Sequence, residues 1–120
     1  MSNHNPTDDS RNNHTAAAEA FFDRARSQFE TEIAALYLFG STARGEASGL
    51  ASDVDILVVL ADDVAQEETA DALRAIAYDV MLEYGPVVEL HVLSGDEFEH
   101  ARAYGNPFIE NVIHEGHAYA

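Results

Sequence analysis

The sequence predicts a single-domain α/β fold in which a small mixed sheet is flanked by helices. Short apolar runs typical of buried strands alternate along the chain with longer segments whose apolar residues recur at helical spacing. A chain of 120 residues has room for one domain, and a hydrophobic content of 47% is enough for a packed core. Residues 1–14 are polar and lack the apolar segment of a signal peptide, so we expect a disordered tail there and the domain over residues 15–120.

Two long helices are predicted from apolar periodicity. In residues 15–30, alanine and phenylalanine recur at i, i+3, i+4, i+7 and i+11, which places them on one face of an amphipathic helix. Asp62 or Asp63 is expected to cap the first turn of the second helix. Gly85 and Pro86 are expected to end that helix, because glycine suits a helix C-cap and proline cannot continue the helix.

The last part of the chain predicts one strand and two short helices. Residues 87–93 form a mostly apolar run, and the capping-box sequence Ser94 to Glu97 opens a helix directly after it. Asn106 and Pro107 mark the start of a final helix, which Gly116 closes. Helices thus alternate with strands, as expected for an α/β domain.

A pair of aspartates stands at the start of the central apolar run. Residues 34–39 and 53–60 are predicted as strands, and Asp53 and Asp55 project from the same face because they lie two residues apart. Two carboxylates this close repel each other, and burial of either without a partner is costly. A divalent cation relieves both problems. Mg²⁺ suits such a pair because it takes oxygen ligands, typically carboxylates together with substrate phosphates.

The turn between these strands has residues suited to phosphate. Gly40 lets the backbone approach a ligand closely, and the Ser41 hydroxyl and nearby amides can hold phosphate oxygens. Residues 41–46 are predicted as a short helix whose first amides face the phosphates. Arg44 either contacts a phosphate or pairs with a carboxylate such as Glu46. A phosphate-holding turn that faces a metal-holding pair is the layout of phosphoryl or nucleotidyl transfer.

Glu89 is a charged residue inside an apolar strand. Alternation places Glu89 and His91 on the face opposite Val88 and Leu90. One interpretation is an edge strand with one solvated face; the other makes Glu89 a third acidic metal ligand, because uncompensated burial of charge is expensive. His91 either assists this site or is a polar strand residue.

The central motif carries a resemblance to a known family. It reads Gly40-Ser41-Thr42-Ala43-Arg44-Gly45-Glu46, then Ser52-Asp53-Val54-Asp55, then the apolar Ile56-Leu57-Val58. It resembles the signature of the DNA polymerase beta-like nucleotidyltransferase superfamily. Over residues 15–115 the element order is similar to that of the minimal nucleotidyltransferases, which are often paired with HEPN-domain toxins. Eleven residues separate Ser41 from Asp53, one more than in the usual minimal pattern.

The resemblance implies a nucleotidyltransferase fold with two Mg²⁺ ions, for which Mn²⁺ is an alternative, and ATP as substrate. The site residues that it implies are Asp53, Asp55 and Glu89 for catalysis and metal, and Gly40, Ser41 and Arg44 for the nucleotide. Glu89 stands where the family usually has an aspartate. The implied reaction moves AMP, or another nucleoside monophosphate, from the triphosphate to a hydroxyl acceptor.

The acceptor is expected to belong to another protein. Larger relatives carry a second, helical domain that holds the acceptor, whereas this chain ends soon after the core. The resemblance implies a HEPN toxin as partner, with AMP added to a tyrosine, so that the protein acts as an antitoxin. Two alternatives stay open: a binding-only antitoxin or nucleotide sensor with weak or no transfer, and transfer to a small cationic molecule such as an aminoglycoside.

The balance of charge is strongly acidic. The chain has 22 aspartates and glutamates, six arginines, no lysine and a formal net charge of −16. This favours a salt-adapted organism over an ordinary acidic surface, because concentrated salt screens the repulsion. Binding to nucleic-acid backbone takes a basic face and is not expected. The absence of cysteine excludes thiolate metal sites and indicates a cytoplasmic location, and no apolar run is long enough to span a membrane.

We expect stability to depend on salt. Like charges repel over a Debye length of about 10 Å at 0.1 M salt, but only about 3 Å at 1 M. The thermal midpoint should therefore rise steadily from about 0.1 M to about 2 M KCl. Circular dichroism would record it, and a flat dependence would show that the acidic surface is not a salt adaptation.

Overall fold

The computed structural model describes residues 6–40, 53–62 and 65–119. The elements in these ranges alternate between helix and strand, which confirms the predicted α/β fold. In chain order they are α1 (Pro6–Phe29), β1 (Ile33–Phe39), β2 (Val54–Leu60), α3 (Gln66–Tyr84), β3 (Val88–Ser94), α4 (Gly95–Ala103), α5 (Pro107–Glu115) and β4 (His117–Ala118). None of the described helices is both long enough and apolar enough to cross a membrane.

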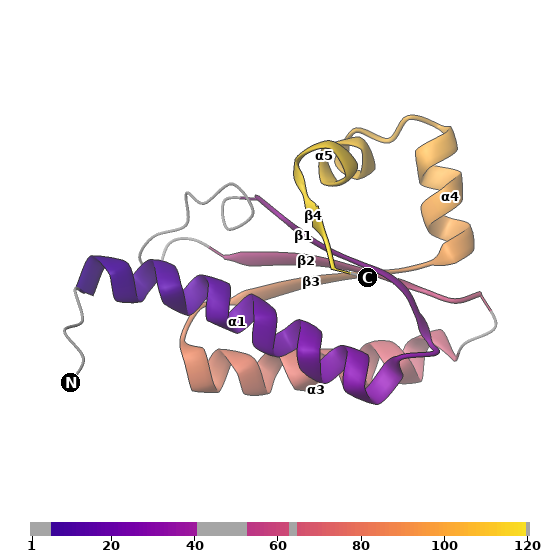
Figure 1. The fold of residues 1–120 in the computed structure, drawn as a ribbon. Coiled ribbons are helices and arrows are strands. Elements are labelled where there is room, and N and C mark those ends of the chain that lie inside the picture. Colours follow the sequence, from indigo (N-terminus) through magenta and orange to yellow (C-terminus); the bar gives the residue numbers. More distant parts are fainter. Residues whose placement is uncertain (1–5, 41–52, 63–64, 120) are drawn as a thin grey trace.

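The strands form one mixed sheet in the order β3-β2-β1-β4. β2 pairs with β3 in parallel, and β1 is antiparallel to both β2 and β4. Helices α1 and α3 cover one face of this sheet, and α4 and α5 cover the other (Figure 1). Strand β3 lies at one edge of the sheet, and none of the other described strands pairs with its outer side.

The sheet has a hydrophobic core on each face because β2 is buried on both. Ile56 and Val58 pack in the cluster that includes α1 and α3, whereas Leu57 and Val59 pack with residues of α4 and α5. Every residue of β2 except Asp55 is buried. A strand buried on both faces reads as a continuous apolar run rather than an alternating one, as residues 56–60 do.

Helix α1 presents its predicted apolar stripe to the sheet. Ala18, Phe21, Phe22 and Ala25 are buried, and the Phe22 ring stacks on Tyr119 with centroids 4.1 Å apart. The helix begins at Pro6 rather than at residue 15, so it extends into the segment that the sequence predicts as a disordered tail. The position of the domain boundary stays a prediction.

The predicted aspartate cap of α3 is wrong. The helix begins at Gln66, and its N-cap is Ala65, which makes no side-chain capping bond. Asp62 instead accepts a hydrogen bond of 2.7 Å from the backbone N–H of Asp96, in the first turn of α4. A carboxylate is favoured there by the unpaired amides and the dipole of the helix start. Asp63 lies outside the described residues.

The other helix ends follow their sequence signals. The Ser94 hydroxyl accepts from the Glu97 N–H at 3.0 Å, and the Glu97 carboxylate accepts from the Ser94 N–H at 2.8 Å, which completes the capping box. The hydrogen bond from Ser94 is the main cause that lowers the pKa of Glu97. Asn106 caps α5, and Gly85 ends α3 with a φ of 101°.

Candidate active site

The parallel pairing of β2 with β3 brings two of the predicted site carboxylates together. Asp55 stands opposite Glu89, and Leu57 stands opposite His91. Neighbouring strands lie about 4.8 Å apart, and residues two apart on one strand share a face. Asp55, Glu89 and His91 therefore project from one face of the sheet, the face that α4 and α5 cover.

These three side chains form a compact group of potential metal ligands. One ligand atom from each lies within 4.8 Å of the others. Within the group, His91 Nε2 is 3.3 Å from Glu89 Oε1. The Glu89 side chain is 53% exposed and that of His91 is 35% exposed, so the group opens to solvent. Glu89 thus lies on a solvated strand edge, as one interpretation of the sequence held, and it also has a carboxylate oxygen within 4.8 Å of one of Asp55.

Gly40 directly follows β1 and lies beside this group. Its φ is +77°, and a Cβ there would collide with Asp55 Oδ2 and lie 3.3 Å from Asp55 Cγ. Phe39, the residue before it, pairs in register with Asp55. The turn that the sequence assigns to phosphate therefore starts against a carboxylate that it assigns to metal. This close approach is possible because glycine has no side chain.

The other predicted site residues are less fully placed. Ser41 and Arg44 lie outside the described residues, and so does the predicted short helix that contains them. Asp53 directly precedes β2 and is half-buried. Among the described residues, the group within ligand distance contains His91 beside Asp55 and Glu89, and it does not contain Asp53. The metal-binding role of Asp53 stays a prediction.

Two aromatic rings, Phe39 and Phe108, form a wall beside His91. The ring centroids of His91 and Phe39 are 5.7 Å apart, those of His91 and Phe108 are 5.1 Å apart, and the two phenylalanines meet edge-to-face at 5.3 Å. The wall joins β1, β3 and the first turn of α5. Sequence reasoning missed Phe108, because its contact with the site depends on how α5 folds back over the sheet. For His91 the sequence did offer a signal, because it lies two residues after Glu89 and residues two apart on a strand share one face.

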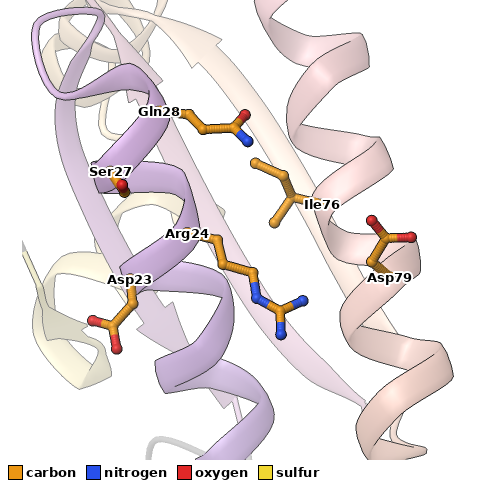
Figure 2. A pocket seen from close by; sticks show the side chains of 6 residues that line it. All are labelled: Asp23, Arg24, Ser27, Gln28, Ile76 and Asp79. Carbon is orange, nitrogen blue, oxygen red and sulfur yellow. The ribbon is translucent and has the colours of Figure 1, made fainter.

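A separate pocket lies across the sheet, between α1 and α3. It has a volume of about 450 Å³, and its lining residues are Asp23, Arg24, Ser27, Gln28, Ile76 and Asp79 (Figure 2). Arg24 extends from α1 into the space between the helices and binds Glu83 through contacts of 2.8 and 2.9 Å. The hydrogen bond from Arg24 is the main cause that lowers the pKa of Glu83. Because the metal-ligand group faces α4 and α5, this pocket does not belong to it.

A family comparison agrees with the arrangement of carboxylates and turn. The family described as nucleotidyltransferase domain matches residues 19–119, most of the chain. The chain belongs to this nucleotidyltransferase family. The match covers every described strand and the whole of the acidic site.

The chain was also compared with solved structures and with curated protein sequences. A crystal structure of a protein from Sulfolobus solfataricus, provisionally assigned as a nucleotidyltransferase, is 22% identical in sequence. The alignment covers 83% of this chain and 84% of that one, with a TM-score of 0.49. No curated protein sequence matches the chain.

The donor atoms of the site fit a divalent cation. The nucleotidyltransferase family typically works with a divalent metal and a nucleoside triphosphate. Asp55 and Glu89 offer carboxylate oxygens, the donors that Mg²⁺ and Mn²⁺ prefer, and His91 adds an imidazole nitrogen. Gly40 leaves room for the Asp55 carboxylate at the rim of the site. The residues present can therefore hold such an ion.

Replacing Gly40 tests whether the close approach of the turn matters. In Gly40→Ala, the new methyl group should displace the Asp55 carboxylate and weaken Mn²⁺ binding by about tenfold or more. Gly105→Ala is the matched control, because Gly105 has a similar φ of +72° but its Cβ would lie 3.6 Å from the nearest atom, Glu110 Oε2. Both variants should lose about 1–2 kcal/mol of stability from left-handed strain. Titration calorimetry measures the Mn²⁺ affinity of both variants. Equal affinities would show that Mn²⁺ binding does not depend on the space that Gly40 leaves for the Asp55 carboxylate.

Proposed function

We propose that this nucleotidyltransferase moves AMP from ATP to a hydroxyl group of a second protein. The observation that carries the proposal is the juxtaposition of Asp55, Glu89 and Gly40 at one end of the sheet. In the reaction the acceptor oxygen forms a bond to the α-phosphorus, and the bond from the α-phosphorus to the β-phosphate oxygen breaks. Pyrophosphate leaves, and the hydroxyl proton passes to a site carboxylate or to water.

Some residues of the site would bind the metal ions, and others would bind the nucleotide. Asp55 and Glu89, together with Asp53, would hold two Mg²⁺ or Mn²⁺ ions, and Gly40, Ser41 and Arg44 would hold the triphosphate. Bound divalent ions supply neutralisation of phosphate charge and activation of the attacking oxygen. The carboxylates would otherwise repel ATP, since the whole chain already carries a net charge of −16. The protein's main contribution is then to position the reactants.

An exposed apolar patch supports a protein as the acceptor. The patch consists of Tyr78 and Leu82 on α3 and Val87 before β3, which are 59%, 69% and 49% exposed. A groove of about 380 Å³ between α3 and β3 includes Tyr78, Val87 and Glu89 in its lining, so the patch borders the strand that carries Glu89. Contiguous exposed apolar residues are typical of protein-binding surfaces. A partner bound there could present a hydroxyl to the metal-ligand group.

The partner that we propose is a HEPN-domain toxin, which would be modified on a tyrosine and thereby silenced. The proposal includes a cytoplasmic location in a salt-adapted cell, where a surface with a net charge of −16 is screened. A second candidate is a binding-only antitoxin, or a nucleotide sensor without transfer. It is favoured by the position of Asp53, which does not join the group formed by Asp55, Glu89 and His91.

Removing a carboxylate from the site should abolish transfer and leave the fold intact. Asp55→Asn and Glu89→Gln each remove a charge that serves the metal, so we expect release of pyrophosphate from ATP to fall by about 100-fold or more. The assay uses molar KCl and the partner protein, and circular dichroism reports the fold. Glu99→Gln is the control, because Glu99 is an exposed α4 residue outside the site. A variant that keeps full activity would show that its carboxylate is not needed for transfer.

Co-expression with a HEPN-domain protein from the same organism tests the acceptor. Intact-mass spectrometry should find one AMP on a tyrosine of the partner, together with loss of its ribonuclease activity. Leu82→Gln should reduce modification because it removes apolar surface from the patch, whereas Tyr104→Gln, a change to a 78% exposed residue elsewhere, should not. A partner that stays unmodified, yet is inhibited equally by the wild type and by Asp55→Asn, would establish the binding-only antitoxin.

A further inference from the structure

We propose that His91 is a nitrogen ligand of the metal held by Asp55 and Glu89, which gives the site a preference for first-row transition metals over Mg²⁺. The inference rests on the metal site of the proposed function and adds a ligand that a site made of carboxylates alone lacks. It also predicts which class of cation the protein takes.

The strand register places the imidazole on the metal side of the sheet. His91 follows Glu89 by two residues on β3, so both project from one face. Asp55 stands opposite Glu89 on β2 and faces the same way. His91 also contacts Phe108 of α5, which lies on that face. The imidazole is therefore directed along the same side of the sheet as the two carboxylates.

The distances are close to those of a loaded site. Metal–ligand bonds of about 2.1 Å allow two ligand atoms of one ion to lie at most about 4.2 Å apart. The ligand atoms of Asp55, Glu89 and His91 lie within 4.8 Å of one another, and the pair formed by Glu89 Oε1 and His91 Nε2 is already at 3.3 Å. Rotation of the exposed Glu89 side chain can bring its carboxylate oxygens closer to the other two ligand atoms.

The aromatic wall holds the imidazole in place before any metal arrives. Phe39 and Phe108 pack around the ring of His91 at centroid distances of 5.7 and 5.1 Å. A ring fixed in this way loses little side-chain freedom when it binds an ion. The side chain is still 35% exposed, so solvent and ions can reach it.

The donor atoms of the group determine which metal ions it prefers. Mg²⁺ takes oxygen ligands almost exclusively, whereas imidazole suits transition metals such as Zn²⁺ and Fe²⁺. Among divalent first-row metals, affinity for such a site generally rises from Mn²⁺ through Fe²⁺ to Cu²⁺. A group of two carboxylates and one imidazole therefore binds transition metals with one more ligand than Mg²⁺ would use. Mn²⁺ is the best probe, because it can be compared with Mg²⁺ and is paramagnetic.

The test is pulsed electron paramagnetic resonance of Mn²⁺ bound to the full chain in molar KCl, without nucleotide. Wild-type protein should show nitrogen coupling from a bound imidazole, and His91→Phe should abolish it while keeping a ring against the aromatic wall. His100→Phe is the control, because His100 lies on α4, contacts Tyr104 just after that helix and is not part of the metal-ligand group, so this variant should keep the coupling. Mn²⁺ affinity should fall about tenfold or more in His91→Phe, and Mg²⁺ affinity by less than about threefold.

Each outcome has a defined meaning. If wild-type protein binds Mn²⁺ without nitrogen coupling, or if coupling persists in His91→Phe, then His91 is not a ligand and the proposal is overturned. Nucleotidyl transfer could still be active in that case, so the two proposals fail separately. Absence of Mn²⁺ binding would overturn this proposal as well. His91→Gln provides a second variant if the phenylalanine does not fold, as judged by circular dichroism, and it should also lose the coupling.

Discussion

The parallel pairing of β2 with β3 determines where chemistry can occur in this domain. Pairing in this register sets Asp55 beside Glu89, and it leaves Val88 and Leu90 on the side that packs against the core of α1 and α3. A slip of one residue would exchange the two faces of β3, and would turn Glu89 into an apolar core and Val88 toward the site. The same hydrophobic contacts that stabilise the sheet therefore hold the carboxylates in place, so the site does not need contacts of its own to fix its position.

Much of the architecture could be predicted because the relevant signals are local. The continuous apolar run of β2 indicated a strand buried on both faces, since such a strand has no solvated side to alternate with. The capping box at Ser94 and the Asn106 cap of α5 fixed two helix starts, because each involves residues at most three positions apart. The grouping of Glu89 with Asp55 was implied by the family resemblance, which places a third acidic residue on the strand that follows the aspartate pair and its helix.

The features that could not be predicted depend on tertiary contacts. Asp62 binds the start of α4 rather than capping α3, a choice between two helix ends that are both nearby only in the folded chain. Strand β4 has two residues, too few to show any periodicity. The wall beside His91 arises when α5 crosses the sheet and brings Phe108 to it. The local spacing of residues in the sequence does not predict contacts of this kind between distant segments.

The position of β4 at the end of the chain leaves one edge of the sheet exposed during synthesis of this domain. β4 covers part of the outer edge of β1, where it pairs with Tyr37 and Leu38 (Figure 1). On the ribosome β1 emerges early, and β4 follows only after β2, α3, β3, α4 and α5, to name the elements that the structure describes between them. Until then the outer edge of β1 is an apolar strand with unpaired backbone groups, the kind of surface on which nascent chains pair with one another. Aggregation through this edge is thus a hazard of the unfinished chain.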